Sequence, residues 1–120
     1  MPWKFDDSRP VYLQIMDEVK QRVLTGVYKP GDKLPSVREL ALEAAVNPNT
    51  MQKALSTLES ENFIHSERTS GRFVTDDMTL IDALRKEQAE SIADEMLSRL
   101  KATGMQNDEI LMLIKAKLGE

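Results

Sequence analysis

Three polar side chains between residues 48 and 56 are suited to contact nucleic acid: Asn49, Gln52 and Lys53. An amide can pair with the edge of adenine through two hydrogen bonds, and an ammonium group suits phosphate or guanine. At helical spacing these side chains lie opposite an apolar stripe that runs from Met51 to Leu58. The alternative is an ordinary surface helix, which these residues alone favour because polar helix faces are common. The neighbouring segments therefore decide between the two interpretations.

Composition argues against several other kinds of chemistry. The chain of 120 residues has no cysteine and one histidine, so disulfides and thiolate metal sites are excluded. Neither a nucleophile–base pair nor a glycine-rich phosphate loop is present, so no enzymatic activity, metal or cofactor is expected. No apolar run approaches the roughly 18 residues of a membrane span. The first residues lack the apolar core of a signal peptide, which indicates a cytoplasmic protein.

The net charge of −4 is unevenly distributed along the chain. Residues 1–75 contain 10 Lys and Arg against 10 Asp and Glu, whereas residues 76–120 contain 6 against 10. Five cations between residues 20 and 38 accompany a single acid, Asp32, so the acidic total is compatible with a local basic face. Affinity for DNA should then be moderate and should fall as salt rises.

Two short helices joined by a tight turn are predicted to position the polar residues. Ser36 and Glu39 form a capping box at the start of the first, and Arg38 lies in its first turn. Asn47 as cap and Pro48 at the first helical position open the second, which extends to about residue 62. A turn of about four residues between them predicts a helix-turn-helix. Because a cation opposes the helix dipole there, Arg38 is a candidate for an external phosphate, with pairing to a nearby acid as the alternative.

A further helix and a hairpin complete the predicted domain. Helical spacing of apolar residues before Gly26 predicts the helix, which ends at that glycine. Two short strands at 63–67 and 72–75 predict the hairpin, which is the wing of a winged helix-turn-helix domain. Arg68 and Arg72 flank its tip, where they could reach a minor groove or phosphate.

Residues 78–120 are predicted to form a tail of two helices, at 79–102 and after a cap at Asn107. Two helices cannot enclose all of their large apolar side chains, so we expect a symmetric homodimer through this tail. Docking of both helices on the winged domain is the alternative.

The expected fold is mainly α with a small β-hairpin: a winged helix-turn-helix domain at 1–77 followed by a dimerisation tail at 78–120. The expected dimer contacts are Leu80, Ile81, Leu84, Ile92, Met96, Leu100, Ile110, Leu111 and Ile114.

Taken together, these segments resemble the GntR family of bacterial transcription regulators over residues 10–75. The short tail resembles the YtrA-type subfamily, because larger members carry a ligand-binding C-terminal domain for which this chain has no room. The resemblance is carried by PVYLQI at 10–15, GVYKPGDKLPSVRELA at 26–41, VNPNT at 46–50, KAL at 53–55, LE at 58–59, and Arg68 with GRFV at 71–74.

The resemblance and the predicted dimer together imply a homodimeric repressor that binds a (pseudo)palindromic operator in double-stranded DNA. Arg38 would contact DNA from one helix, and Asn49 and Thr50 would do so from the recognition helix. The chain departs from the family at Thr69, which replaces a wing glycine, and at Asn62, which replaces another glycine but tolerates a left-handed conformation. The expected DNA-contacting residues are Lys33, Ser36, Arg38, Asn47, Asn49, Thr50, Lys53, Arg68 and Gly71.

A winged-helix adaptor that binds a protein and not DNA is the second interpretation. The balanced charge of residues 1–75 supports it. Salt-titrated binding separates the two, because DNA binding must weaken steeply with salt. The sequence identifies no small-molecule effector and leaves that partner open.

Overall fold

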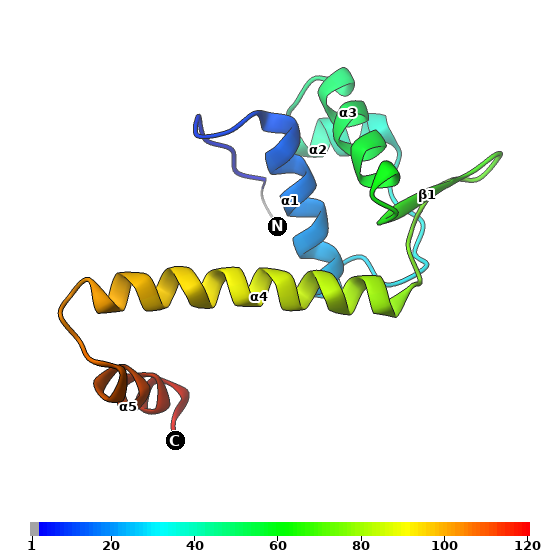
Figure 1. Ribbon diagram of the computed structural model, residues 1–120. Helices are drawn as coiled ribbons and strands as arrows, with labels where there is room; N and C mark the ends of the chain where they lie inside the picture. Colours follow the sequence, from blue (N-terminus) through cyan, green and yellow to red (C-terminus); the bar gives the residue numbers. More distant parts are fainter. Residues whose placement is uncertain (1–2) are drawn as a thin grey trace. The chain divides into compact units, whose positions relative to one another are not determined.

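The computed structural model describes residues 3–120 and divides into two compact units, with the boundary in the sequence between Asp82 and Ala83. Its secondary structure confirms the expected mainly helical fold with one antiparallel hairpin. α4 begins in the first unit and continues into the second. In chain order the elements are α1 (Val11–Leu24), α2 (Val37–Ala44), α3 (Pro48–Ser60), β1 (Ile64–Glu67), β2 (Gly71–Val74), α4 (Met78–Lys101) and α5 (Asn107–Leu118) (Figure 1).

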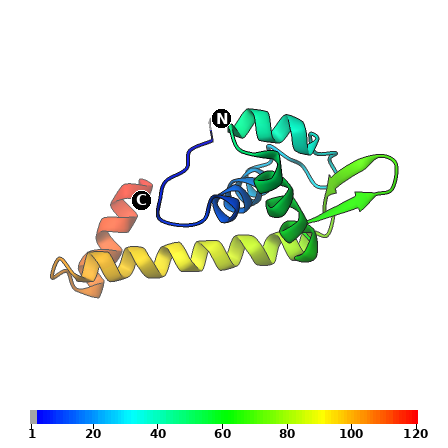
Figure 2. The same ribbon diagram turned by 90° about the horizontal axis from the view of Figure 1, so that it is seen from above.

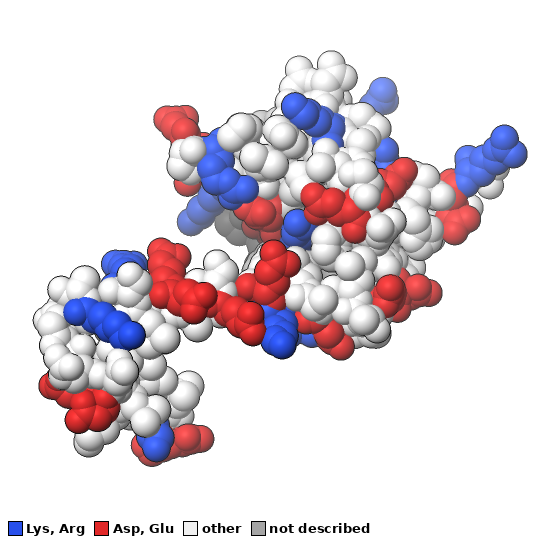
Figure 3. Space-filling view, viewed as in Figure 1, with Lys and Arg blue, Asp and Glu red and all other residues white. Residues whose placement is uncertain are grey.

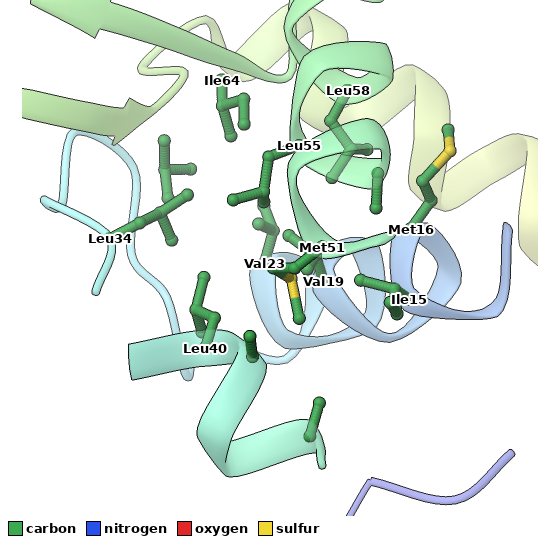
Figure 4. Close-up of a cluster of buried hydrophobic side chains, with 14 of the residues drawn as sticks. Ile15, Met16, Val19, Val23, Leu34, Leu40, Met51, Leu55, Leu58 and Ile64 are labelled. Atoms are coloured by element: carbon green, nitrogen blue, oxygen red, sulfur yellow. The ribbon is translucent and has the colours of Figure 1, made fainter. Parts of the chain in front are cut away.

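The core of the first unit forms where α1, α2, α3 and the hairpin converge (Figure 4). Each of these elements contributes apolar side chains that are at most 4% exposed. Burying one large apolar side chain stabilises the fold by about 1.5–3 kcal/mol. The core therefore fixes which face of α3 points outward. Its largest members include Ile15, Val19, Leu34, Leu40, Met51, Leu55, Leu58 and Ile64.

The first turn of α4 belongs to this core as well. Ile81 is 2% exposed and is part of the same hydrophobic cluster, so the first unit extends to Asp82 rather than ending at residue 77. A side chain already enclosed by its own chain has almost no surface to offer a second copy, which corrects the assignment of Ile81 as a dimer contact. Leu84 and Ile110 are also buried within the chain and have little surface left for another contact.

Local hydrogen bonds explain where the two central helices begin. The Ser36 hydroxyl accepts from the Glu39 N–H at 3.1 Å, and the Glu39 carboxylate accepts from the Ser36 N–H at 3.2 Å, which confirms the predicted capping box. The Asn47 side chain accepts from the Asn49 N–H at 2.7 Å, which confirms the predicted cap of α3.

Some predicted boundaries were wrong. α3 ends at Ser60, and Asn62 follows with a left-handed φ of 68°, as expected of an asparagine in this place. Gln106 rather than Asn107 caps α5, and its N–H donates to the Glu109 carboxylate at 2.9 Å. Ala45 also adopts a left-handed φ, of 57°, and closes α2 so tightly that only three residues separate it from α3.

The hairpin is anchored to the segment that precedes α2. β1 and β2 pair in register from Ile64↔Val74 to Glu67↔Gly71, and Lys33 forms an isolated bridge with Phe73. This bridge holds the backbone before α2 in an extended conformation beside β2. The hairpin projects from the helices of the first unit, as both ribbon views show (Figure 2).

The second unit contains most of α4 and all of α5. A hollow of about 360 Å³ is lined by side chains from both helices, among them Leu97, Ile110 and Ile114. Several large apolar side chains remain outside, with Ile92 66% and Met112 73% exposed. None of the helices in residues 3–120 has the length and apolarity needed to cross a membrane.

Candidate nucleic-acid interface

The start of α3 presents polar groups that the core leaves uncovered. Asn49 and Lys53 are exposed on the side of the helix opposite Met51, and Thr50 is half-buried on its flank. The oxygen of the Asn47 side chain is occupied by the cap, so that residue keeps mainly its amide N–H groups for an outside partner. This end of α3 can therefore offer both donors and acceptors to the edge of a base.

Arg38 lies on the first turn of α2 with its side chain exposed. It forms no hydrogen bond or ion pair with any residue between 3 and 120, so pairing with a nearby acid, the alternative considered above, is not observed. A free guanidinium near the positive end of a helix can hold an external phosphate through two parallel hydrogen bonds.

A hollow of about 360 Å³ separates the start of α2 from the hairpin. Lys33, Ser36 and Gly71 line it, although they come from segments that are far apart in sequence. Gly71 has a φ of 109°, and a Cβ at this position would lie 3.2 Å from Cε of Lys33. Glycine thus provides both the backbone conformation and the room that the lysine side chain uses.

Lys53 is held beside the first helix by an aromatic ring. Its Nζ lies 4.1 Å from the ring centroid of Tyr12, which is a cation–π contact. The contact keeps the ammonium group on the same exposed surface as Asn49 while leaving it in reach of solvent.

The two wing arginines differ in their contacts. Arg68 is exposed in the turn between β1 and β2, and Figure 3 shows basic surface at the end of the projecting hairpin. Arg72, by contrast, packs against α3: its Nε is 3.3 Å from the Glu59 carboxylate and its Nη1 is 3.4 Å from the Gln52 amide oxygen. Arg72 therefore lies against α3 and does not extend freely from the hairpin tip, and its contact with DNA stays a prediction.

The cation-rich segment between residues 20 and 38 is less of a basic surface than its composition suggests. Arg22 is only 3% exposed and donates to Glu18 at 2.9 Å and to Glu43 and Tyr28 at 3.1 Å each. Burial opposes the charge of this guanidinium, but the hydrogen bonds outweigh it and raise the pKa of Arg22. Lys20 pairs with Glu61 at 3.1 Å. Neither cation is therefore available to a phosphate.

Comparison with known proteins agrees with this geometry. The family model "Bacterial regulatory proteins, gntR family" matches residues 11–74. The HTH-type transcriptional regulator YhcF of Bacillus subtilis (strain 168) is 35% identical over 112 residues, which cover 93% of each chain. The HTH-type transcriptional repressor YtrA of the same organism is 48% identical over 69 residues, which cover 58% of this chain and 53% of YtrA.

Solved structures extend the likeness to three dimensions. A GntR family transcriptional regulator from Listeria monocytogenes superimposes with a TM-score of 0.84 at 37% identity, covering 93% of this chain and 98% of the other. The DNA-binding domain of AraR in complex with operator ORX1 matches with a TM-score of 0.56 at 27% identity, covering 60% of this chain and 93% of that domain.

Proposed function

The chain belongs to the gntR family of bacterial regulatory proteins, and from this premise we propose that it is a sequence-specific DNA-binding transcriptional repressor. The observation that carries the proposal is the exposed Arg38 at the start of α2, which has no partner among residues 3–120 and lies in the helix preceding α3. The similar YtrA of Bacillus subtilis is a repressor, and the similar domain of AraR is seen with an operator.

In the proposed complex, α3 enters the major groove with its N-terminal end closest to the bases. Asn49 pairs with a base edge, for which a good bidentate pair gives about 1–3 kcal/mol of discrimination. Arg38, Lys33 and Thr50 hold phosphates and set the register of the protein on the duplex. Arg68, at the exposed end of the wing, approaches the neighbouring minor groove.

The proposed repressor acts as a homodimer on a (pseudo)palindromic operator. Ile92, Met96 and Leu111 are exposed apolar side chains of the second unit and support an interface between two copies. Two recognition helices related by a two-fold axis would contact half-sites about one helical turn apart, roughly 34–36 Å.

The test is Arg38→Ala, measured by gel shift on the DNA that the wild-type chain enriches from a random pool. We expect an affinity loss of about tenfold or more, because hydrogen bonds to charged groups contribute about 1.5–3 kcal/mol each. Lys86→Ala, which removes an exposed cation of α4, should leave the affinity unchanged.

Unchanged affinity in a folded Arg38→Ala protein would contradict the role given to this residue. Binding by the wild-type chain should also weaken steeply between low and moderate salt. A wild-type chain that binds no DNA even at low salt would instead favour the protein-interaction adaptor.

A further inference from the structure

A chain of hydrogen bonds joins the wing to the middle of the recognition helix. The Ser66 hydroxyl and Arg72 Nε donate to the same Glu59 oxygen, at 2.6 and 3.3 Å. Arg72 Nη1 donates to the Gln52 amide oxygen at 3.4 Å, and the Gln52 amide nitrogen donates to the Ser56 hydroxyl at 3.1 Å. Because Ser66 and Arg72 are cross-strand partners, Glu59 receives one contact from each strand of the wing.

These contacts orient the Gln52 side chain, which is exposed on α3 one turn after Asn49. Its amide oxygen faces Arg72, and one of its two amide hydrogens is given to Ser56. The second hydrogen and the other lone pair of the oxygen stay free for an outside partner. An amide that is already oriented loses less conformational freedom on binding than a mobile one.

We propose that Gln52 determines the preference for one base pair in each half-site, and that Glu59 and Arg72 are positioning residues that orient it. The wing thereby influences sequence preference at a base that it does not touch. This inference rests on the proposed DNA-binding function and adds to it a coupling between the wing and α3.

The chemistry of Glu59 and of Arg72 suits them to orient the Gln52 side chain. An unpaired carboxylate on a recognition helix would repel phosphates, but the charge of Glu59 is offset by the guanidinium of Arg72. The hydrogen bond from Ser66, opposed by partial burial and reinforced by Arg72, lowers the pKa of Glu59, so the carboxylate stays ionised and keeps accepting. The planar guanidinium of Arg72 reaches two acceptors at once, which the single ammonium group of a lysine cannot do in the same geometry.

The test compares the base preferences of variants of the 120-residue chain. The wild-type protein first selects a motif from a random DNA pool, and Gln52→Ala then identifies the base pair whose preference depends on Gln52. At that base pair we expect a loss of about threefold to tenfold in discrimination, the equivalent of one hydrogen bond. Arg72→Lys and Glu59→Gln should reduce discrimination at the same base pair and leave the other positions unchanged.

The controls separate orientation from charge. Arg72→Lys keeps the positive charge, so a plain phosphate contact would survive this change. Glu61→Gln removes a carboxylate of the same type at the end of the same helix, where it pairs with Lys20 and not with the wing, and it should leave every base preference unchanged.

The outcomes are distinct. If Arg72→Lys and Glu59→Gln, folded as judged by circular dichroism, change affinity for all sequences equally or not at all, the positioning role is overturned while the DNA-binding function stands. If Gln52→Ala alters no base preference, the reading role of Gln52 is overturned. If the wild-type chain enriches no motif, the proposed function fails and this inference fails with it.

Discussion

Arg22 is a charged side chain that serves the fold rather than a partner. Its guanidinium lies 4.3 Å from the ring centroid of Trp3 and is hydrogen-bonded to acids of α1 and α2. The residue thus joins the segment before α1, the first helix and the second helix around one buried cation. An arginine in this position cannot also bind DNA.

Replacing Arg22 with alanine should lower the free energy of unfolding by about 2–3 kcal/mol, because it leaves Glu43 and Glu18 without their partner and removes a packed aliphatic stem. Urea denaturation of both proteins measures the difference. Lys86→Ala deletes an exposed cation whose carboxylate contact is 4.0 Å long, and it should change stability by less than about 0.5 kcal/mol. An equally small effect of Arg22→Ala would show that the buried network contributes little.

The partners of individual charged side chains were the features that the sequence predicted least reliably. Glu18 lies one helical turn before Arg22, so that pair was visible in the sequence, but Glu43 is 21 residues away. The pairing of Arg72 with Glu59 is likewise set by how the wing meets α3, which composition does not report. In contrast, Arg38 could be singled out locally, because a cation in the first turn of a capped helix is unusual.

For the helices, short-range sequence patterns were the most informative predictors of where each element begins. The capping box at Ser36 and the cap at Asn47 are short-range patterns, and each marks a helix start that the structure confirms. The end of the domain was harder to predict. Nothing in the residues around Ile81 distinguishes a core contact from a dimer contact, because both require only an apolar side chain at helical spacing.

Asn62, which follows the end of α3, gives a test of this local control. Asn62 has a φ of 68°, a conformation that costs roughly 1 kcal/mol or more for a residue with an ordinary Cβ. Asn62→Ala should therefore destabilise the chain by about 1 kcal/mol, whereas Asn62→Gly should be neutral or slightly stabilising. Thermal unfolding of the two variants beside the wild type measures both effects, and a more stable alanine variant would contradict the argument.

For the whole molecule, the main expectation is that two copies associate through the second unit. Ile92→Glu places a carboxylate among exposed apolar side chains and should weaken the dimer at least about tenfold, since burying an unpaired charge is unfavourable. Size-exclusion chromatography with light scattering distinguishes one chain of 13.6 kDa from two.

Ser91→Glu is the matched control, because it adds the same charge to the neighbouring position on an exposed, largely acidic part of α4. This variant should remain as dimeric as the wild type. A dimer that Ile92→Glu leaves intact would mean that the apolar surface around this residue is not the interface.

The stacking of Trp3 on Arg22 also provides a built-in optical label. Trp3 is the only tryptophan of the chain and belongs to the first unit, whereas helical circular dichroism arises from both units. Emission from the indole therefore follows the melting of one unit, and ellipticity follows the melting of the whole. Whether the two signals coincide during a denaturant titration reports directly on the cooperativity between the units, without a dye or a mutation.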